Sequence, residues 1–148
     1  MGNKYLASTI NTSQGDYRVI VGKSILGELG KELDKANLNN KRCFLIADKS
    51  MFPKQTKSLH ESLESQGFIT NSLSMEFSEE LKTHSTVSKI YNWLADMKAE
   101  RKDFIISMGG GVAGDIIGFA ASTYLRGIPF IQIPTTLASM TDAAIGGK

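Results

Sequence analysis

Three glycines in the second half of the chain stand at a spacing that suits a bound phosphate. Gly109, Gly111 and Gly114 form the pattern G-x-G-x-x-G directly after the apolar run 104–108, and a nearly uncharged stretch follows. Glycine lets a backbone turn tightly and approach a phosphate with no Cβ atom in the way, and the N–H groups and dipole of a following helix attract the anion. The pattern therefore predicts a turn for a dinucleotide pyrophosphate. A tight strand–helix turn without a ligand is the alternative.

Two carboxylates have positions that suit a nucleotide. The usual dinucleotide pattern has an acid roughly 20 residues after its glycines, and this sequence has none there. Asp115 instead stands at the start of the expected helix, where it could also serve as a simple partner of the helix dipole. Asp48 follows the strand-like run 42–47, and a carboxylate at the carboxyl end of a strand can accept hydrogen bonds from ribose hydroxyls. A helix N-cap is the alternative for Asp48.

Other polar residues are candidates for ligand contacts, each with an ordinary structural alternative. Glu79 and Lys82 lie three apart, and a solvated charged loop would explain them equally. Thr135 and Thr136 follow the apolar run 130–133, where they either face a ligand at the sheet edge or cap a helix. Three further residues are candidates for phosphate or substrate: Arg126 after the apolar helix, Lys148 after a glycine pair, and Asp142, an acid within an apolar stretch whose burial would be costly.

Metal and nucleophile chemistry have little support in these residues. His60 and His84 are far apart and have no carboxylate or histidine at ligand spacing, so we expect no metal site in this chain. Cys43 is the single cysteine and lies within an apolar run, which predicts a small core residue. Asp115 follows Gly114 where a nucleotide kinase has lysine, which argues against a P-loop.

Alternating strand and helix patterns surround these residues. Val87, Ile90, Tyr91 and Leu94 repeat at helical spacing, and residues 104–108 form the continuous apolar run of a strand covered on both faces. The alternation predicts an α/β fold: a Rossmann-like, mostly parallel sheet with helices on both faces and the apolar helix central and buried. Expected strands are 17–21, 42–47, 69–75, 104–108 and 130–133. Expected helices are 24–36 with Ser24 as cap, 53–65 ended by Gly67, 85–99 and 112–125.

Length and charge narrow the function classes. The 148 residues suit one domain, and a net charge of +2 with scattered basic residues gives no sign of a nucleic-acid partner. No apolar run is long enough for a membrane span or a secretory signal, so we expect a cytoplasmic protein.

The segment 108–148 closely resembles the 3-dehydroquinate synthase family. It carries that family's blocks Gly-Gly-Gly-Val-x-Gly-Asp, Tyr-x-Arg-Gly, Pro-Thr-Thr-Leu and Asp-x-x-x-Gly-Gly-Lys, and Glu79-x-x-Lys82 resembles a further segment upstream. The resemblance extends over essentially the whole chain, more weakly in the first half. It implies conversion of 3-deoxy-D-arabino-heptulosonate 7-phosphate, a phosphorylated sugar acid, into 3-dehydroquinate and phosphate on the shikimate pathway to aromatic amino acids, with NAD as a catalytic oxidant.

The resemblance also assigns roles residue by residue. It implies that Arg126, Asp142 and Lys148 face the substrate, with Arg126 and Lys148 on phosphate, and it raises a role of Arg126 in the neighbouring subunit's site of a homodimer. The remaining assignments are to NAD: Asp48, Ser50, Glu79, Lys82, Gly110, Gly111, Val112, Gly114, Asp115, Thr135 and Thr136. Ser78 and Ser50 depart from the family's usual Gly and Asn, and Ala143-Ala144 from a common Ser pair.

Residues 1–148 are accordingly expected to be the NAD-binding, N-terminal domain of a longer enzyme. The family's second, mostly helical domain supplies a Glu and two His ligands for zinc or cobalt, which this chain lacks, so the chain alone is expected to be inactive. Other sugar-phosphate cyclases and iron-dependent alcohol or glycerol dehydrogenases remain alternatives. A stand-alone nucleotide-binding module is the alternative of another class.

Overall fold

A four-stranded parallel sheet forms the centre of the molecule. The computed structural model describes residues 4–13, 15–35, 40–51 and 53–145. Its main strands are β3 (Arg42–Asp48), β4 (Ile69–Met75), β5 (Phe104–Gly109) and β6 (Phe130–Pro134), in the order β4-β3-β5-β6. Every neighbouring pair is parallel. The two inner strands have the continuous apolar runs of strands covered on both faces, and their residues are almost completely buried. The predicted parallel sheet is therefore confirmed.

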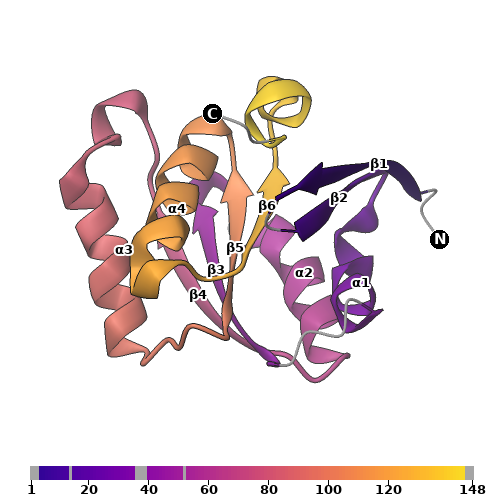
Figure 1. Cartoon of the computed structure of the whole chain (residues 1–148), viewed down its shortest axis with the longest axis horizontal. Helices are drawn as coiled ribbons and strands as arrows, with labels where there is room; N and C mark the ends of the chain where they lie inside the picture. The colour runs from indigo at the N-terminus through magenta and orange to yellow at the C-terminus, as the bar shows by residue number, and fades with distance from the viewer. Residues whose placement is uncertain (1–3, 14, 36–39, 52, 146–148) are drawn as a thin grey trace.

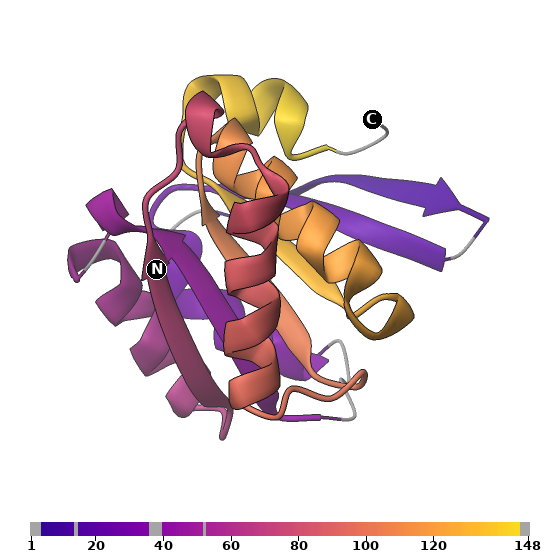
Figure 2. The same ribbon diagram turned by 90° about the vertical axis from the view of Figure 1, so that its left-hand side faces the viewer.

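Two helices cover each face of this sheet (Figure 1). On one face, α1 (Leu29–Lys35) and α2 (Lys54–Glu64) pack on a core that includes Leu45 and Ile106. On the other, α3 (His84–Asp96) and α4 (Gly111–Thr123) pack on a core that includes Phe44 and Ile105. Figure 2 shows α3 and α4 side by side across the strands. No helix in the described part of the chain is both long and apolar enough to cross a membrane.

An antiparallel hairpin of β1 (Lys4–Thr12) and β2 (Gly15–Gly22) stands beside the main sheet. The sequence predicted a strand at the place of β2, but β1 was not predicted. From Leu6 on, the described side chains of β1 are exposed or half-buried, so no buried face marks this strand in the sequence. A bulge between Leu6 and Ser8 further interrupts its alternation. The Tyr17 hydroxyl of β2 donates a hydrogen bond to the carbonyl oxygen of Ile145, which joins the hairpin to the far end of the described chain.

Two helix boundaries differ from the prediction. Ser24 has a left-handed backbone (φ 57°) and makes no side-chain cap; a 3₁₀ turn, Ile25–Glu28, follows it before α1 begins. The apolar helix α4 ends at Thr123, because Leu125 (φ 50°) and Arg126 (φ 67°) are left-handed. This helix is also less enclosed than its composition predicts, since Phe119 is 49% exposed.

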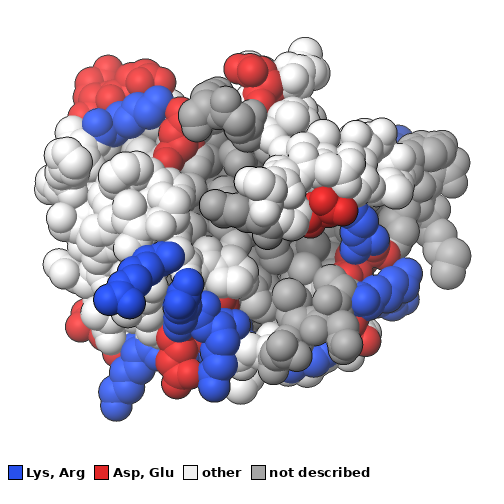
Figure 3. Space-filling view, in the orientation of Figure 1, with Lys and Arg blue, Asp and Glu red and all other residues white. Residues whose placement is uncertain are grey.

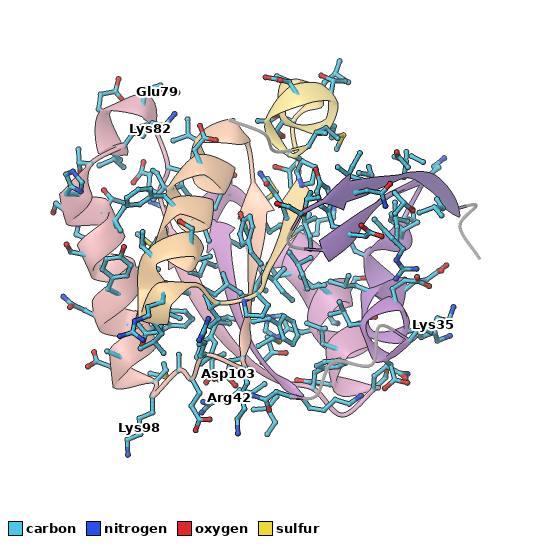
Figure 4. The ribbon with its side chains drawn as sticks, in the orientation of Figure 1. Lys35, Arg42, Glu79, Lys82, Lys98 and Asp103 are labelled. Atoms are coloured by element: carbon cyan, nitrogen blue, oxygen red, sulfur yellow. The ribbon has the colours of Figure 1, made fainter. Side chains whose placement is uncertain are left out.

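An ion pair that the sequence analysis did not identify ties the amino edge of the sheet together. Asp103, just before β5, is fully buried and accepts hydrogen bonds from Arg42 Nε at 2.9 Å and Nη2 at 2.5 Å. It also accepts from the Glu100 backbone N–H at 2.7 Å and from the side chain of Asn40. Figure 4 shows Arg42 and Asp103 together at the edge where β3 and β5 begin, opposite Glu79 and Lys82. The contact therefore joins the first residue of β3 to the loop before β5.

Cys43 is a core residue, as predicted, and its thiol is expected to be unreactive in the folded chain. It is fully buried in β3, and burial raises the pKa of its thiol to about 11 from 9. The thiolate fraction at pH 8 is then lower by about two orders of magnitude. We expect an aromatic disulfide reagent to label Cys43 at least about a hundredfold more slowly in buffer than in concentrated urea. Equal rates would contradict the burial of Cys43.

Candidate nucleotide site at the carboxyl edge of the sheet

Nearly all the candidate nucleotide residues lie at one edge of the sheet, where the parallel strands end. Asp48 is the last residue of β3, Gly109 the last of β5, and Thr135 directly follows β6. The register pairs Ala47 with Met108 and Gly109 with Pro134, so these ends are neighbours. In open α/β sheets, ligands bind in the crevice outside the carboxyl ends of the strands.

The glycine turn joins β5 to α4 and leaves room above the first turn of the helix. Gly110 is the N-cap residue and has no side chain to accept a hydrogen bond from the helix. The N–H groups of Gly111 and Val112 therefore have no acceptor within the helix, and they are available to an anion. Among the described residues, a Cβ atom at Gly111 would meet only the Cβ of Ala143, at 3.5 Å, which is an ordinary contact. The fold itself thus tolerates a side chain at position 111, and the space there is open to a ligand.

The flanking glycines have a different role, which is close packing. A Cβ atom at Gly109 would lie 2.6 Å from the Cβ of Ala113, and one at Gly114 would lie 1.9 Å from Nε2 of Gln132. None of the three glycines of the motif has a positive φ, so close packing, and not backbone conformation, favours glycine at these two flanking positions. Gln132 was not singled out in the sequence. Its position two residues after Phe130 in β6, on the same face as that ring, was the available signal.

Lys82 links the loop after β4 to the first turns of α4. Its Nζ lies 2.8 Å from Oδ2 of Asp115 and 4.0 Å from Oε2 of Glu79. The hydrogen bond with Asp115, followed by the attraction of its charge, raises the pKa of Lys82. These side chains are largely exposed, and Figure 4 places Glu79 and Lys82 at the same corner. Figure 3 shows acidic and basic side chains meeting there, above an uncharged stretch of the front face.

Asp48 and Ser50 form a local turn. Oδ1 of Asp48 accepts from both the backbone N–H of Ser50, at 2.8 Å, and its hydroxyl, at 2.5 Å. This contact stabilises the 3₁₀ turn Lys49–Met51, so the capping alternative considered for Asp48 is realised in part. The Cβ of Asp48 also lies 3.6 Å from where a Cβ of Gly109 would be, so this carboxylate borders the glycine turn.

The Thr pair after β6 combines a cap with a position at the turn. Thr136 Oγ1 lies 2.9 Å from Ser139 Oγ and accepts from the Ser139 N–H at 3.2 Å, at the start of the π-helical segment Ser139–Ala143. Thr136 therefore does cap the following helical segment, which was the alternative to a ligand contact. The methyl group of Thr136 lies 3.3 Å from where a Cβ of Gly110 would be, and the Thr135 N–H donates to the carbonyl of Gly109. Ser139, buried and bonded to Thr136, was not predicted to take part.

A hollow of about 710 Å³ opens beside α4, along its residues 114–122. Its lining includes the charged side chains of Lys82 and Asp115 as well as Phe119, Phe130 and Gln132. Val112, another residue assigned to the nucleotide, is half-buried against the core between α3 and α4. The edge thus combines free helix N–H groups, carboxylates, hydroxyls and an ammonium group, which can together hold a phosphorylated nucleotide. Within the described residues, no three His, Cys, Asp or Glu side chains are grouped to hold a metal ion.

The three residues assigned to the substrate do not all lie with the nucleotide candidates at the carboxyl edge of the sheet. Arg126 follows α4 at its carboxyl end, and a helix of this length separates it from the glycine turn by about 20 Å. Asp142 lies near the turn in the π-helical segment but is exposed, so the argument from a buried carboxylate was wrong. Lys148 lies outside the described residues.

The sequence comparisons agree on one family. Residues 72–148, more than half of the chain, match the family model described as 3-dehydroquinate synthase N-terminal. A curated 3-dehydroquinate synthase of Clostridium kluyveri is 40% identical over 142 residues, which are 96% of this chain and 39% of that protein. The chain thus spans about two fifths of the length of the curated relatives it matches.

Solved structures give the same fold. A 2-deoxy-scyllo-inosose synthase superposes with a TM-score of 0.81 over 92% of this chain and 38% of that one, at 24% identity. The 2-epi-5-epi-valiolone synthase of Streptomyces hygroscopicus, solved with NAD+ and Zn2+ bound, superposes with a TM-score of 0.68 at 29% identity, over 74% of this chain and 31% of that one. With the match to the family model and the curated relatives, the chain belongs to the 3-dehydroquinate synthase family.

Proposed function

We propose that this chain is the NAD-binding part of a 3-dehydroquinate synthase. The observation that carries the proposal is the cradle at the start of α4, where the first N–H groups have no acceptor within the helix and, among the described residues, a Cβ atom at Gly111 would meet only Ala143. The proposed reaction converts 3-deoxy-D-arabino-heptulosonate 7-phosphate into 3-dehydroquinate and phosphate. The family match and the curated relatives of that name support this substrate above the other sugar-phosphate cyclases.

Each residue of the edge has a task in this proposal. The N–H groups of Gly111 and Val112 bind the pyrophosphate, and Asp48, whose Oδ1 is engaged by Ser50, accepts from a ribose hydroxyl through Oδ2. The hydroxyl of Thr136 borders the same space, and we assign the neighbouring Thr135 hydroxyl to NAD as well. Bound NAD supplies the capacity to take up a hydride from the substrate and return it.

Lys82 and Asp115 hold the position of the nucleotide on the α4 side. Their 2.8 Å contact fixes the ammonium group beside the first turns of α4, and Glu79 stands next to it. Neutralising Asp115 keeps a free carboxylate from repelling the pyrophosphate. We place the metal ion of the proposed reaction outside these residues, since the described side chains offer no ligand set for it.

Arg126 is proposed to bind the substrate phosphate in a neighbouring subunit. The length of α4 places it about 20 Å from the glycine turn of its own chain, to which we assign NAD. A homodimer that places the carboxyl end of α4 against the partner's carboxyl edge would bring the two together. A guanidinium group binds phosphate oxygens in a bidentate manner, which suits this task.

A chimera tests the proposed reaction directly. This chain would replace the matching amino-terminal part of the Clostridium kluyveri relative, and phosphate release from 3-deoxy-D-arabino-heptulosonate 7-phosphate would be measured. We expect NAD-dependent release by the chimera and none by the 148 residues alone, because the reaction needs groups outside this chain. Release by the isolated chain, or a folded chimera that binds NAD but does not act on this substrate, would contradict the proposal.

Within that chimera, Arg126→Ala is expected to lower kcat/KM by roughly 10- to 100-fold, the loss of one or two charge-assisted hydrogen bonds. The affinity for NAD should change less than about twofold, because the arginine is remote from the glycine turn. Arg101→Ala, an exposed arginine in the loop before β5, is the matched control and should leave both constants unchanged. A loss of NAD affinity in Arg126→Ala would mean that the arginine contacts NAD and that its assignment to the substrate is wrong.

Mixing variants tests the placement across subunits. In a heterodimer of Arg126→Ala with Gly111→Val, one site combines an intact glycine turn with the intact arginine of the partner subunit. Activity should therefore rise when the two impaired homodimers are dissociated and reassembled together. If the arginine acts within its own subunit, neither site of the heterodimer is intact and the mixture is no more active than the separate homodimers.

A further inference from the structure

The turn that carries Arg126 has an unusual backbone. Leu125 (φ 50°, ψ 31°) and Arg126 (φ 67°) are consecutive left-handed residues with side chains, and Gly127 follows at φ 108°. Left-handed backbone is unfavourable for residues with a Cβ atom, and two in a row persist only where their surroundings enforce them. Residues with strained backbone cluster at active sites and ligand-binding sites.

Two tyrosines hold the residues on the amino-terminal side of this turn. The ring of Tyr124, next to Leu125, stacks on the ring of Tyr91 from α3 at 6.1 Å between centroids and 28° between planes. The Tyr91 hydroxyl forms a hydrogen bond with Thr123 Oγ1, and the Thr123 hydroxyl in turn donates a hydrogen bond to the Phe119 carbonyl oxygen at 2.8 Å. Tyr91 therefore contacts both residues that precede the left-handed pair.

Backbone hydrogen bonds close the turn on its other side. The Gly127 N–H donates to the Tyr124 carbonyl oxygen, and the Ile128 N–H donates to that of Ala121, each at 2.9 Å. Both acceptors belong to the end of α4 or to the stacked tyrosine itself. The Gly127 bond requires that Tyr124 stay in place, and the ring of Tyr124 is held by the stack with Tyr91. The ring of Tyr124 is enclosed enough that burial raises the pKa of its hydroxyl.

We propose that Tyr91 is a positioning residue for Arg126. By stacking on Tyr124 and bonding Thr123, it keeps Leu125 and Arg126 left-handed and so fixes the direction in which the exposed guanidinium group leaves the surface. The consequence for catalysis rests on the proposed function of Arg126, whereas the consequence for the turn does not. Without Tyr91, the strained pair relaxes and the arginine samples other directions.

Amide hydrogen exchange of the 148-residue chain tests the effect on the turn. In Tyr91→Ala, the amides of Gly127 and Ile128 should exchange about tenfold faster or more, while the core amides of Ile105 and Ile106 keep their rates. Tyr91→Phe, which keeps the stack, should show a smaller effect, and Lys89→Ala on the same helix should show none. Adding Leu125→Gly to Tyr91→Ala should restore most of the protection, because glycine adopts the left-handed backbone without strain.

Kinetics of the chimera test the effect on the arginine. Tyr91→Ala should raise KM for the substrate about tenfold, leave the affinity for NAD unchanged, and recover on addition of Leu125→Gly. Unchanged exchange at Gly127 and Ile128, or no recovery by Leu125→Gly, would overturn the proposal whatever the chimera does. Faster exchange with a normal KM would overturn the positioning role, and an inactive parent chimera would instead count against the proposed function.

Discussion

The Gly111→Val variant is expected to lose NAD binding while the chain stays folded. A Cβ atom at this position would meet only Ala143, at 3.5 Å, among the described residues. The valine methyl groups would therefore occupy the space that we assign to the pyrophosphate. Losing two charge-assisted hydrogen bonds from the helix N–H groups costs about 3 kcal/mol or more, which is a loss of affinity of about a hundredfold. Calorimetric titration with NAD measures it.

Gly118→Ala is the matched control for this variant. It adds a methyl group two turns further along α4, where a Cβ atom would lie 3.4 Å from the ring of Phe130. NAD affinity should be retained there, and thermal unfolding of both variants should confirm that each is folded. Normal NAD affinity in a folded Gly111→Val chain would show that the pyrophosphate does not lie on this turn.

The Asp103→Ala variant is expected to lower the free energy of unfolding by about 3–5 kcal/mol, because it leaves a partly buried guanidinium group without its partner. Asp103 is fully buried and accepts from both Arg42 and the Glu100 N–H, so several donors lose their acceptor at once. The contact joins β3 to the loop before β5. Among the described residues, no other ion pair involves a residue of β3 or β5. Urea unfolding monitored by circular dichroism measures the loss.

Asp34→Ala provides the comparison for this second variant. Asp34 also pairs with a cation, Lys41, but both side chains are largely exposed, and exposed pairs contribute about 0–1 kcal/mol. We therefore expect a change in unfolding free energy several times smaller than that of Asp103→Ala. Similar losses for the two variants would mean that burial of the Arg42–Asp103 pair does not determine its effect.

The architecture was predictable because its strongest patterns are also its most buried elements. The apolar runs of β3 and β5 and the helical spacing of Val87, Ile90 and Leu94 in α3 report directly on burial, which the structure confirms. The strand β1 was missed because its described side chains bury no face. The left-handed turn at Leu125 and Arg126 was missed because no local pattern marks it; the contacts that hold it come from α3, more than thirty residues earlier.

The site was predictable in its location more than in its contacts. Asp48, Gly109 and Thr135 follow strands that the sequence identified, and parallel strands end at one edge, so their proximity followed. The contact between Lys82 and Asp115 joins residues 33 positions apart, and the approach of Gln132 to Gly114 depends on the side chains packed between α4 and β6. The roles of all these residues toward NAD stay predictions.

The most direct test of the central claim is a titration of the ¹⁵N-labelled chain with NAD, followed by nuclear magnetic resonance. We expect weak, saturable binding, with a Kd in the range of about 10 μM to 1 mM, because the chain holds only part of the site. The largest shifts should fall on the amides of the first turn of α4 and on those of Asp48, Thr135 and Thr136, and they should disappear in Gly111→Val. Saturable shifts centred elsewhere, or none at several times the upper limit of that range, would contradict NAD binding at the glycine turn.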